Sequence, residues 1–263
     1  MVMTGLLLDL DGVFYIGDEA VAGAAATARW LRAESVPHLF LTNTTSRPRM
    51  SIVQRLRRLG IEVDAADVLT PCVAAVTWLA ERGLGHPALF VPDDTAADFA
   101  ALDPAPIDRP GPVDAVVVGD LGERWDFATL NRAFRLLMTP QRPPLVALGM
   151  TRYWRAPDGL RLDTGAFVAA LGAASGSDPV VLGKPSTAFY AGAVQALECA
   201  PQDVVMVGDD IRTDVAGAQS AGLRGVLVRT GKFAPTDLHA GVVPDAVLDS
   251  IAALPAWWAD HRP

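Results

Sequence analysis

Apolar runs alternate with helix-like segments at both ends of the chain. The first run, Gly5–Leu10, is followed by the Ala-rich segment Ala22–Ser35, a second run at Pro37–Thr42, and a segment with apolar residues at helical spacing, Arg49–Gly60. Short, continuous apolar runs are typical of strands buried on both faces of a sheet. Because a strand-helix-strand-helix order implies parallel strands with right-handed crossovers, we predict an α/β fold built on a parallel sheet.

The C-terminal third of the chain repeats this order. We predict strands at Val180–Leu182, Val204–Val207 and Gly225–Arg229, and a last edge strand at 244–248. The predicted helices that separate or follow them are Ser186–Leu197, Asp214–Ala221 and Asp249–Ala259. Both ends of the chain are therefore expected to contribute strands to one sheet.

The middle of the chain contains a second set of elements. We predict helices at Pro71–Arg82, Asp126–Met138 and Gly165–Ala174, and strands at Ala88–Val91, Ala115–Val118 and Leu145–Leu148. We interpret this set as a second α/β unit inserted into the first. The predicted division is a core formed by residues 1–69 and 178–263 and an insert formed by residues 70–177.

Composition excludes several classes of protein. The 263 residues are 51% hydrophobic and 20% charged, as expected for a globular protein with a sizeable core. The net charge of −8 disfavours nucleic acid and anionic membranes as main partners. No stretch approaches the roughly 20 apolar residues of a membrane span, so we expect a cytoplasmic protein. Two cysteines, Cys72 and Cys199, are too few for a disulfide framework.

Two carboxylates lie at the end of the first predicted strand. Asp9 and Asp11 in the run Asp9-Leu10-Asp11-Gly12 are two residues apart, so in extended backbone both side chains point to the same side. The carboxyl ends of parallel strands form the edge where ligands bind in such sheets. An acidic surface turn is the alternative, since Asp-Gly is a common turn pair.

A second acidic run, Gly208–Asp214, follows the strand Val204–Val207. Carboxylate oxygens are the protein ligands that Mg²⁺ prefers. Asp9 and Asp209, with Asp210 or Asp214, are candidate ligands for such an ion. Helix capping is the alternative for Asp214, because Asp is favoured at helix starts.

Two further strand ends carry polar residues of other kinds. Thr42 to Ser46 follow the strand Pro37–Leu41, and hydroxyls with free backbone N–H groups at a helix start form an anion site. Lys184, after Val180–Leu182, is one of only two lysines, the other being Lys232; the remaining 20 cations are arginines. A lysine retained at a strand end favours a role for a compact point charge over a planar guanidinium. We expect all four strand ends to lie along one sheet edge.

These motifs, in this order, resemble the haloacid dehalogenase-like phosphohydrolases. The matching residues are the DxDG run at Asp9, Thr42 at the second strand end, Gly183-Lys184-Pro185, and the GDxxxxD run from Gly208 to Asp214. The resemblance implies a Rossmann-like core with the insert as a large α/β cap, as in the NagD-like branch. The tract Leu39–Arg49, with Phe134-Arg135-Leu136-Leu137 and Arg152-Tyr153, further resembles a subgroup of this branch that is close to a phosphatase of inorganic pyrophosphate and phosphoamides.

The resemblance also implies roles for the core residues. Asp9 would attack phosphorus and form an aspartyl-phosphate, and Asp11 would act as general acid and then general base. Mg²⁺ would be held by Asp9, the backbone carbonyl of Asp11 and Asp209, and its bound waters would contact Asp210 and Asp214. Lys184 would hold Asp9 and the phosphoryl group. In this superfamily, an acidic residue at the position of Asp11 is typical of members that transfer phosphoryl groups. Asp11 therefore argues against a dehalogenase.

Substrate binding is implied at two sets of positions. Those expected to bind the phosphoryl oxygens are Leu10, Asp11, Gly12, Thr42, Asn43 and Lys184. Those in the cap expected to select the organic group are Arg152, Tyr153, Trp154 and Asp163, where Tyr153 and Trp154 are alternatively part of the cap's core. Asp163 replaces a small residue of the family's pattern, and an acid there would repel polyanions or contact an amine.

The resulting hypothesis is a Mg²⁺-dependent phosphatase of a small phosphorylated metabolite. An inorganic pyrophosphate or phosphoamide phosphatase is the alternative within the class, and phosphomutase chemistry shares the first step. A phosphate-binding or protein-interaction module without turnover is the alternative outside the class. A second copy of the chain is a further candidate partner, since the pair Trp257-Trp258 near the C-terminus either closes the core or packs on another surface.

Overall fold

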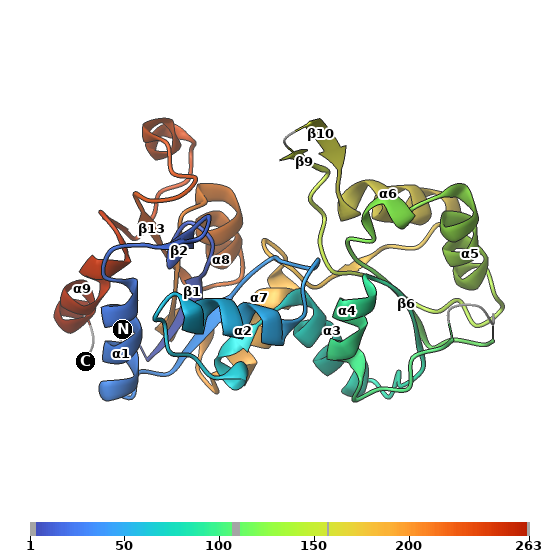
Figure 1. The fold of residues 1–263 in the computed structure, drawn as a ribbon, viewed down its shortest axis with the longest axis horizontal. Coiled ribbons are helices and arrows are strands. Elements are labelled where there is room, and N and C mark those ends of the chain that lie inside the picture. The colour runs from blue at the N-terminus through green and yellow to red at the C-terminus, as the bar shows by residue number, and fades with distance from the viewer. Residues whose placement is uncertain (1–3, 107–110, 157, 262–263) are drawn as a thin grey trace. The chain divides into compact units, whose positions relative to one another are not determined.

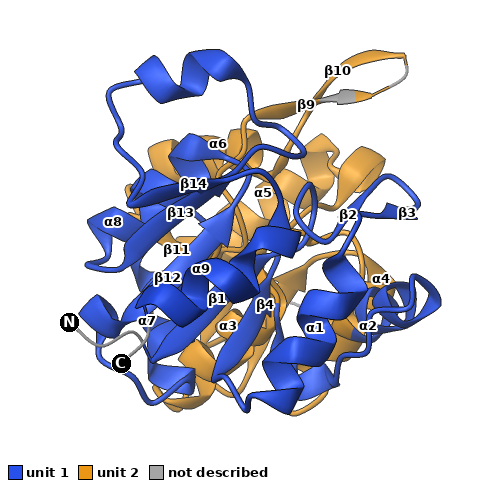
Figure 2. Ribbon diagram, turned by 90° about the vertical axis from the view of Figure 1, so that its left-hand side faces the viewer, with its two compact units in different colours: residues 1–42, 50–69, 184–263 blue, residues 43–49, 70–183 orange. Residues whose placement is uncertain are grey.

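The computed structural model describes residues 4–106, 111–156 and 158–261, and the chain divides into two compact units (Figure 1). The first unit takes its residues from the ranges 1–42, 50–69 and 184–263, and the second unit from 43–49 and 70–183 (Figure 2). Each unit contains its own parallel sheet, which confirms the predicted α/β class.

The sheet of the first unit has the strand order β14-β13-β12-β1-β4-β5, and every neighbouring pair is parallel. Its strands are β1 (Gly5–Asp9), β4 (His38–Leu41), β5 (Val68–Leu69), β12 (Val204–Gly208), β13 (Arg224–Val228) and β14 (Ala246–Leu248). The order places the N-terminal strand β1 between β12 from the C-terminal third and β4. The two ends of the chain therefore build one sheet, as the sequence predicts.

Helices cover both faces of this sheet. They are α1 (Ala24–Ala33), α2 (Arg49–Arg58), α7 (Thr187–Ala196), α8 (Gly217–Ser220) and α9 (Leu254–His261), together with a π-helix at Ile211–Ala216. Leu6 and Leu8 of β1 pack with α1, α2 and α9 in one core cluster. The intervening Leu7 is equally inaccessible to solvent, so β1 is buried on both faces. This double burial explains the continuous apolar run of β1.

The sheet of the second unit has the order β11-β8-β7-β6, again entirely parallel. Its strands are β6 (Pro87–Phe90), β7 (Ala115–Val118), β8 (Leu145–Ala147) and β11 (Val180–Val181). Its α-helices are α3 (Pro71–Ala80), α4 (Asp93–Ala96), α5 (Phe127–Leu137) and α6 (Thr164–Ser175). An antiparallel hairpin of β9 (Tyr153–Ala156) and β10 (Gly159–Leu162) precedes α6 and extends away from the sheet of this unit (Figure 2).

Side-chain caps fix the starts of several helices in the second unit. The Thr70 hydroxyl accepts a hydrogen bond from the Val73 N–H, with Pro71 at the first helical position of α3. The carboxylates of Asp126 and Asp163 cap α5 and α6 by accepting hydrogen bonds from backbone N–H groups of Thr129 and Thr164. Such caps satisfy N–H groups that have no partner inside the helix.

The shorter elements complete the path of the chain. A small antiparallel hairpin pairs β2 (Tyr15–Ile16) with β3 (Glu19–Ala20). Single 3₁₀ turns lie at Ala65–Asp67, Ala97–Phe99, Gly122–Arg124, Pro201–Asp203, Pro235–His239 and Ile251–Ala253. Within the described residues, no helix combines the length and the apolar character needed to cross a bilayer.

A strand is found at the predicted position Val180–Leu182, as β11, but the sheet predicted for it is wrong. Val180–Val181 does not belong to the sheet that contains β1; its residues pair in parallel with Val146 and Ala147 of β8 in the second unit. Lys184 therefore follows a strand of the other sheet, and the expectation that four strand ends share one edge fails for this one. An apolar run before a Gly-Lys pair predicts a buried strand equally well in either sheet, because periodicity carries no information about partners.

Smaller differences concern helix starts and the C-terminus. The helix α2 begins at Arg49 as predicted, so the run Thr42 to Ser46 precedes the helix and does not form its first turn. The helix predicted at Asp214–Ala221 begins earlier, as the π-helix Ile211–Ala216. Trp258 is buried in the core of the first unit, and Trp257 packs against the same cluster.

Candidate active site

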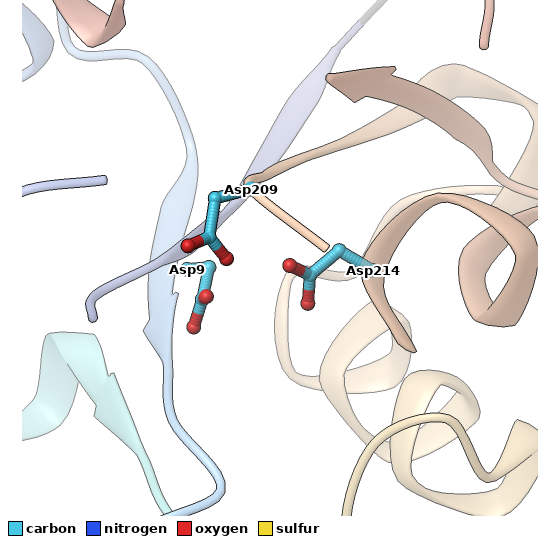
Figure 3. A group of neighbouring side chains, drawn as sticks. All are labelled: Asp9, Asp209 and Asp214. Atoms are coloured by element: carbon cyan, nitrogen blue, oxygen red, sulfur yellow. The ribbon is translucent and has the colours of Figure 1, made fainter. Parts of the chain in front are cut away.

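Two neighbouring strands of the first unit lead into aspartates at the same edge of the sheet. β1 ends at Asp9, and Asp209 directly follows β12. Because Leu8 lies opposite Val207 in the parallel pair, Asp9 and Asp209 emerge side by side. Asp9, Asp209 and Asp214 are buried, and each offers a carboxylate oxygen within 4.8 Å of the others. Figure 3 shows the Asp214 side chain facing the other two.

A buried lysine lies against two of these carboxylates. The Nζ atom of Lys184 is 2.6 Å from Asp9 Oδ1 and 2.7 Å from Asp214 Oδ1, and Lys184 is only 5% exposed. Charge-assisted hydrogen bonds of this length are the strong ones. One ammonium therefore holds together carboxylates that would otherwise repel each other.

The turn between β12 and the π-helix positions Asp214. The carboxylate of Asp210 caps the π-helix by accepting hydrogen bonds from the N–H groups of Arg212 and Thr213 at 2.9 and 3.1 Å. The N–H of Asp210 in turn donates to Asp214 Oδ2 at 3.1 Å. The capping role weighed for Asp214 thus belongs to Asp210, and Asp214 is a fully buried ion-pair partner of Lys184.

Two glycines and a backbone N–H group hold Asp209. A Cβ atom at either Gly12 or Gly231 would overlap the Asp209 carboxylate, and both glycines have positive φ values, 84° and 63°. The N–H of Lys232 donates to Asp209 Oδ2 at 2.7 Å. Asp209 Oδ1 is buried and has no hydrogen-bond partner among the described residues. An unsatisfied buried carboxylate oxygen is costly, so its retention points to a bound ligand.

Burial and neighbouring charges shift the pKa values of the ionisable side chains in the cluster. Burial raises the pKa of Asp9; Lys184 opposes this rise and the Asp209 charge adds to it. Burial raises the pKa of both Asp209 and Asp214 to about 6, with the Asp9 charge adding to the rise at Asp214. Burial would lower the pKa of Lys184, but Asp214 and Asp9 outweigh it and raise the pKa. The site therefore carries more negative charge than Lys184 balances.

Comparison with known proteins places this arrangement in a family. The family model described as haloacid dehalogenase-like hydrolase matches residues 6–101, and a second model, HAD-hydrolase-like, matches residues 181–254. The phospholysine phosphohistidine inorganic pyrophosphate phosphatase of Bos taurus is 38% identical over 253 residues, covering 94% of this chain and 91% of its own. The chain belongs to the haloacid dehalogenase-like hydrolases. The predicted family is thereby confirmed.

Two further similarities concern the branch of these hydrolases. The haloacid dehalogenase-like hydrolase domain-containing protein 2 of Rattus norvegicus is 39% identical over 239 residues, which are 90% of this chain and 88% of its own. The structure of NagD from E. coli superposes with a TM-score of 0.83 at 23% identity, covering 96% of this chain and 98% of NagD. The fold of this chain is therefore similar to that of NagD along nearly its whole length.

The acidic cluster of this hydrolase fits a divalent metal ion. Its donors are hard carboxylate oxygens, which suit Mg²⁺ and not a softer metal. Asp9 and Asp209 contribute oxygens close to each other, and Asp209 Oδ1 is the unpartnered one. Asp214 is less suited to direct ligation, because Lys184 and the Asp210 N–H already occupy its two oxygens.

The residues predicted to bind phosphate lie around the ends of β1 and β4. Asp11 is exposed, and Leu10 is fully buried. The N–H of Gly12 donates to the Tyr15 carbonyl at 2.8 Å, so Gly12 acts here by leaving room for Asp209. Thr42 follows β4 and is 3% exposed. Asn43, the next residue, belongs to the second unit.

The predicted specificity residues all lie in the second unit on or beside the β9–β10 hairpin. Tyr153 and Trp154 are 53% and 46% exposed, so neither belongs to a core. The Arg152 guanidinium lies 5.9 Å from the centre of the Tyr153 ring. Asp163 caps α6 and lines a cavity together with Trp154.

Several residues that position the acidic side chains were not identified from the sequence. The role of Lys232, unexplained from the sequence, is to bind Asp209 through its N–H and to place Nζ 3.6 Å from Asp210. Both lysines of the chain therefore contact the acidic cluster. In the sequence, only the position of Gly231 before Lys232 pointed to it. Nothing in the sequence pointed to Tyr190, whose hydroxyl donates to the Thr213 carbonyl at 2.8 Å.

We predict that Gly231→Ala destabilises the protein more than Gly60→Ala. Both residues have positive φ values, so each substitution costs about 1 kcal/mol of backbone strain. Only at position 231 would the new Cβ overlap the Asp209 carboxylate and approach the Gly12 backbone, which adds roughly 1–3 kcal/mol. Urea unfolding of the two variants measures the difference. Equal costs would mean that Asp209 shifts freely and is not held by the glycines.

Proposed function

We propose that the chain is a Mg²⁺-dependent phosphatase that hydrolyses a small phosphorylated metabolite through an aspartyl-phosphate on Asp9. The observation that carries the proposal is the 2.6 Å ion pair of buried Asp9 with buried Lys184, beside Asp209. Buried charges cost folding free energy, and apolar residues of similar volume are often as stable. A cluster of this kind at the ligand-binding edge of a parallel sheet is therefore best explained by chemistry.

In the first step, an Asp9 carboxylate oxygen forms a bond to phosphorus while the bond from phosphorus to the leaving oxygen breaks. Asp11 donates a proton to that oxygen, so the leaving group departs as an alcohol. In the second step, the Asp11 carboxylate takes a proton from water, whose oxygen bonds to phosphorus as the bond to Asp9 breaks. Phosphate leaves, and both aspartates return to their starting forms.

The charges around Asp9 allow two anions to approach each other. Lys184 offsets the negative charge of Asp9 and, in this proposal, of the transferred phosphoryl group. Asp9, Asp209 and the Asp11 carbonyl would hold Mg²⁺, with Asp210 and Asp214 contacting its waters. When bound, the ion supplies a Lewis acid that draws charge from the phosphoryl oxygens.

The remaining phosphoryl oxygens need donors. Thr42, Asn43 and the backbone N–H groups of Leu10 and Asp11 are proposed to supply them, because they follow the ends of β4 and β1. In the second unit, Arg152, Tyr153, Trp154 and Asp163 are proposed to select the organic group. Their partial exposure leaves them available to a ligand.

A second candidate class of substrate differs from phosphomonoesters in its leaving group. The bovine relative is named for phospholysine, phosphohistidine and inorganic pyrophosphate, and it is 38% identical along nearly the whole chain. The same aspartyl-phosphate chemistry serves P–N and P–O–P bonds, because these leaving groups also accept a proton from Asp11. A substrate panel of phosphomonoesters, pyrophosphate and imidodiphosphate separates the two candidates by kcat/KM.

We predict that turnover requires Mg²⁺. Hydrolysis of p-nitrophenyl phosphate falls to background after treatment with EDTA and returns on addition of excess Mg²⁺. Ca²⁺ restores little activity, because it is larger and takes more ligands at longer distances than Mg²⁺. Full activity in EDTA would contradict the metal part of the proposal. Absence of turnover with every metal and substrate would favour the alternative of a phosphate-binding module without activity.

A further inference from the structure

A short hairpin of the first unit follows Asp11 in the chain. Its strands β2 and β3 contain two residues each, and Gly17 and Asp18 form the turn between them. An isolated two-stranded hairpin is marginally stable at best, so strands this short need support from another element. Both turn residues are exposed, so burial of the turn does not provide that support.

Arg55 of α2 makes three contacts with this hairpin, all within the first unit. Its Nη2 atom donates a hydrogen bond to the Gly17 carbonyl and lies 3.2 Å from Asp18 Oδ1. Its guanidinium carbon lies 4.4 Å from the centre of the Tyr15 ring, a distance typical of a cation–π contact. The Arg55 side chain is 23% exposed and Tyr15 is 3% exposed, so these contacts are partly shielded from water. One side chain therefore binds both the first strand and the turn of the hairpin.

Tyr15 connects the hairpin to the backbone that carries Asp11. Tyr15 and Asp11 form a β-bridge, and the Tyr15 carbonyl accepts a hydrogen bond from the Gly12 N–H at 2.8 Å. The Tyr15 N–H donates to the Leu10 carbonyl at 3.3 Å. Asp11 itself is exposed, so its position depends on this backbone more than on packing of its own side chain. A shift of Tyr15 would therefore move Asp11.

We propose that Arg55 is a positioning residue that holds Asp11 in place as the general acid, acting through Tyr15 and the β2–β3 hairpin. Because Asp11 is the acid of the proposed function, this role of Arg55 rests on that proposal. Loss of the Arg55 guanidinium would impair proton donation to the leaving oxygen. Attack by Asp9 would be retained, because Asp9 is the last residue of the buried strand β1.

The test compares two aryl phosphates whose leaving groups differ in their need for a proton. p-Nitrophenolate leaves readily without one, whereas phenol resembles the tyrosine side chain, which keeps its proton up to about pH 10. Phenyl phosphate therefore depends on the general acid more strongly than p-nitrophenyl phosphate does. The readout is the kcat/KM for p-nitrophenyl phosphate divided by the kcat/KM for phenyl phosphate. Later hydrolysis of the aspartyl-phosphate does not enter kcat/KM, so this ratio reports the first step alone.

Arg55→Met is the main variant. Methionine keeps an apolar side chain beside Tyr15 and removes only the guanidinium, so the fold is retained. A positioned general acid contributes about 10²–10⁴-fold to the rate, so its partial displacement raises the ratio about tenfold. In Arg55→Lys the ratio rises less, because an ammonium keeps the cation–π contact with Tyr15 but lacks the fork of a guanidinium.

Arg57→Met is the matched control. Arg57 lies on the same helix, donates to the Val63 carbonyl at 2.8 Å and pairs with Asp64 at 3.3 Å. It therefore makes the same two kinds of polar contact as Arg55, but with a different segment, and its variant keeps the parent ratio. Asp11→Asn, which lacks the acid altogether, shows the full rise in the ratio. A general loss of folded protein lowers both rates equally and leaves the ratio unchanged.

The possible failures give different patterns. If Asp11→Asn raises the ratio but Arg55→Met does not, Arg55 does not position the acid, and the phosphatase proposal stands. An equal rise in Arg55→Met and Arg57→Met also overturns the role of Arg55. If Asp11→Asn leaves the ratio unchanged, Asp11 is not the acid, and the role of Arg55 falls with that part of the proposed function. If the parent hydrolyses neither substrate, the proposed function fails as a whole, and the role of Arg55 with it.

Discussion

Asp9→Asn protein folds but hydrolyses p-nitrophenyl phosphate at least about a thousandfold more slowly than the parent, because the amide is not a nucleophile toward phosphorus. The neutral side chain also loses the charge that pairs with Lys184 at 2.6 Å. A second measurement makes the result specific to the proposed intermediate. After acid quench of a reaction with labelled substrate, the parent retains covalent phosphate and the variant retains none.

The stability of this variant separates chemistry from folding. Burial raises the pKa of Asp9 in the folded state, and Asp209 adds to the rise. A carboxyl with a raised folded pKa contributes stability at low pH and loses it as the pH rises through that pKa. Removing the charge at neutral pH therefore leaves stability unchanged or increases it, while Lys184 keeps Asp214 as a partner at 2.7 Å. Thermal unfolding at pH 7.5 measures this.

Asp249→Asn is the matched control for Asp9→Asn. Asp249 directly follows β14 in the same sheet, but its side chain is 88% exposed and pairs with Arg229. Its neutralisation leaves turnover unchanged, because a surface ion pair contributes little. If Asp9→Asn were as active as the parent, or if both variants were equally impaired, Asp9 would not be the nucleophile.

The ends of β1 and β12 could be predicted from the sequence, and the end of β11 could not. Asp9 and Asp209 follow continuous apolar runs, and the parallel order of an α/β sheet places such ends at one edge. Lys184 also follows an apolar run, but that run pairs with β8 of the second unit. Its Nζ atom nevertheless lies 2.6 Å from Asp9 Oδ1. The periodicity of a strand carries no information about where a long side chain ends.

Local backbone geometry was the other feature that could not be predicted from the sequence. Gly12 was included for its place in the motif, whereas its observed contribution is space for the Asp209 carboxylate, shared with Gly231 from a distant turn. The β9–β10 hairpin was not predicted, because its one apolar alternation, Leu160-Arg161-Leu162, is only three residues long, and the structure leaves both leucines exposed. Asp214 was weighed as a cap because Asp favours helix starts, but a π-helix begins three residues earlier and buries it. The close approach of Gly12, Gly231 and Asp209 depends on segments far apart in sequence, which no local pattern predicts.

Lys184→Arg is the second substitution with a large expected effect, although it keeps the positive charge. The Lys184 ammonium is a compact donor between Asp9 Oδ1 and Asp214 Oδ1, in a position only 5% exposed. A guanidinium is larger, planar and donates in a fixed fork, so it displaces the carboxylates. A displacement near 1 Å at the reacting groups costs about a hundredfold in rate. We therefore expect kcat for p-nitrophenyl phosphate to fall about a hundredfold.

Lys232→Arg is a control that the chain itself offers, because Lys232 is the other lysine. Its side chain is 67% exposed and its Nζ lies 3.6 Å from Asp210, while Asp209 is bound by the Lys232 N–H, which any residue but proline retains. An exposed arginine reaches Asp210 without displacing a buried group, so kcat stays within about twofold of the parent. Equal loss in both variants would mean that net charge alone matters. Full activity of Lys184→Arg would mean that the site accepts any cation, and the scarcity of lysine would then have no bearing on catalysis.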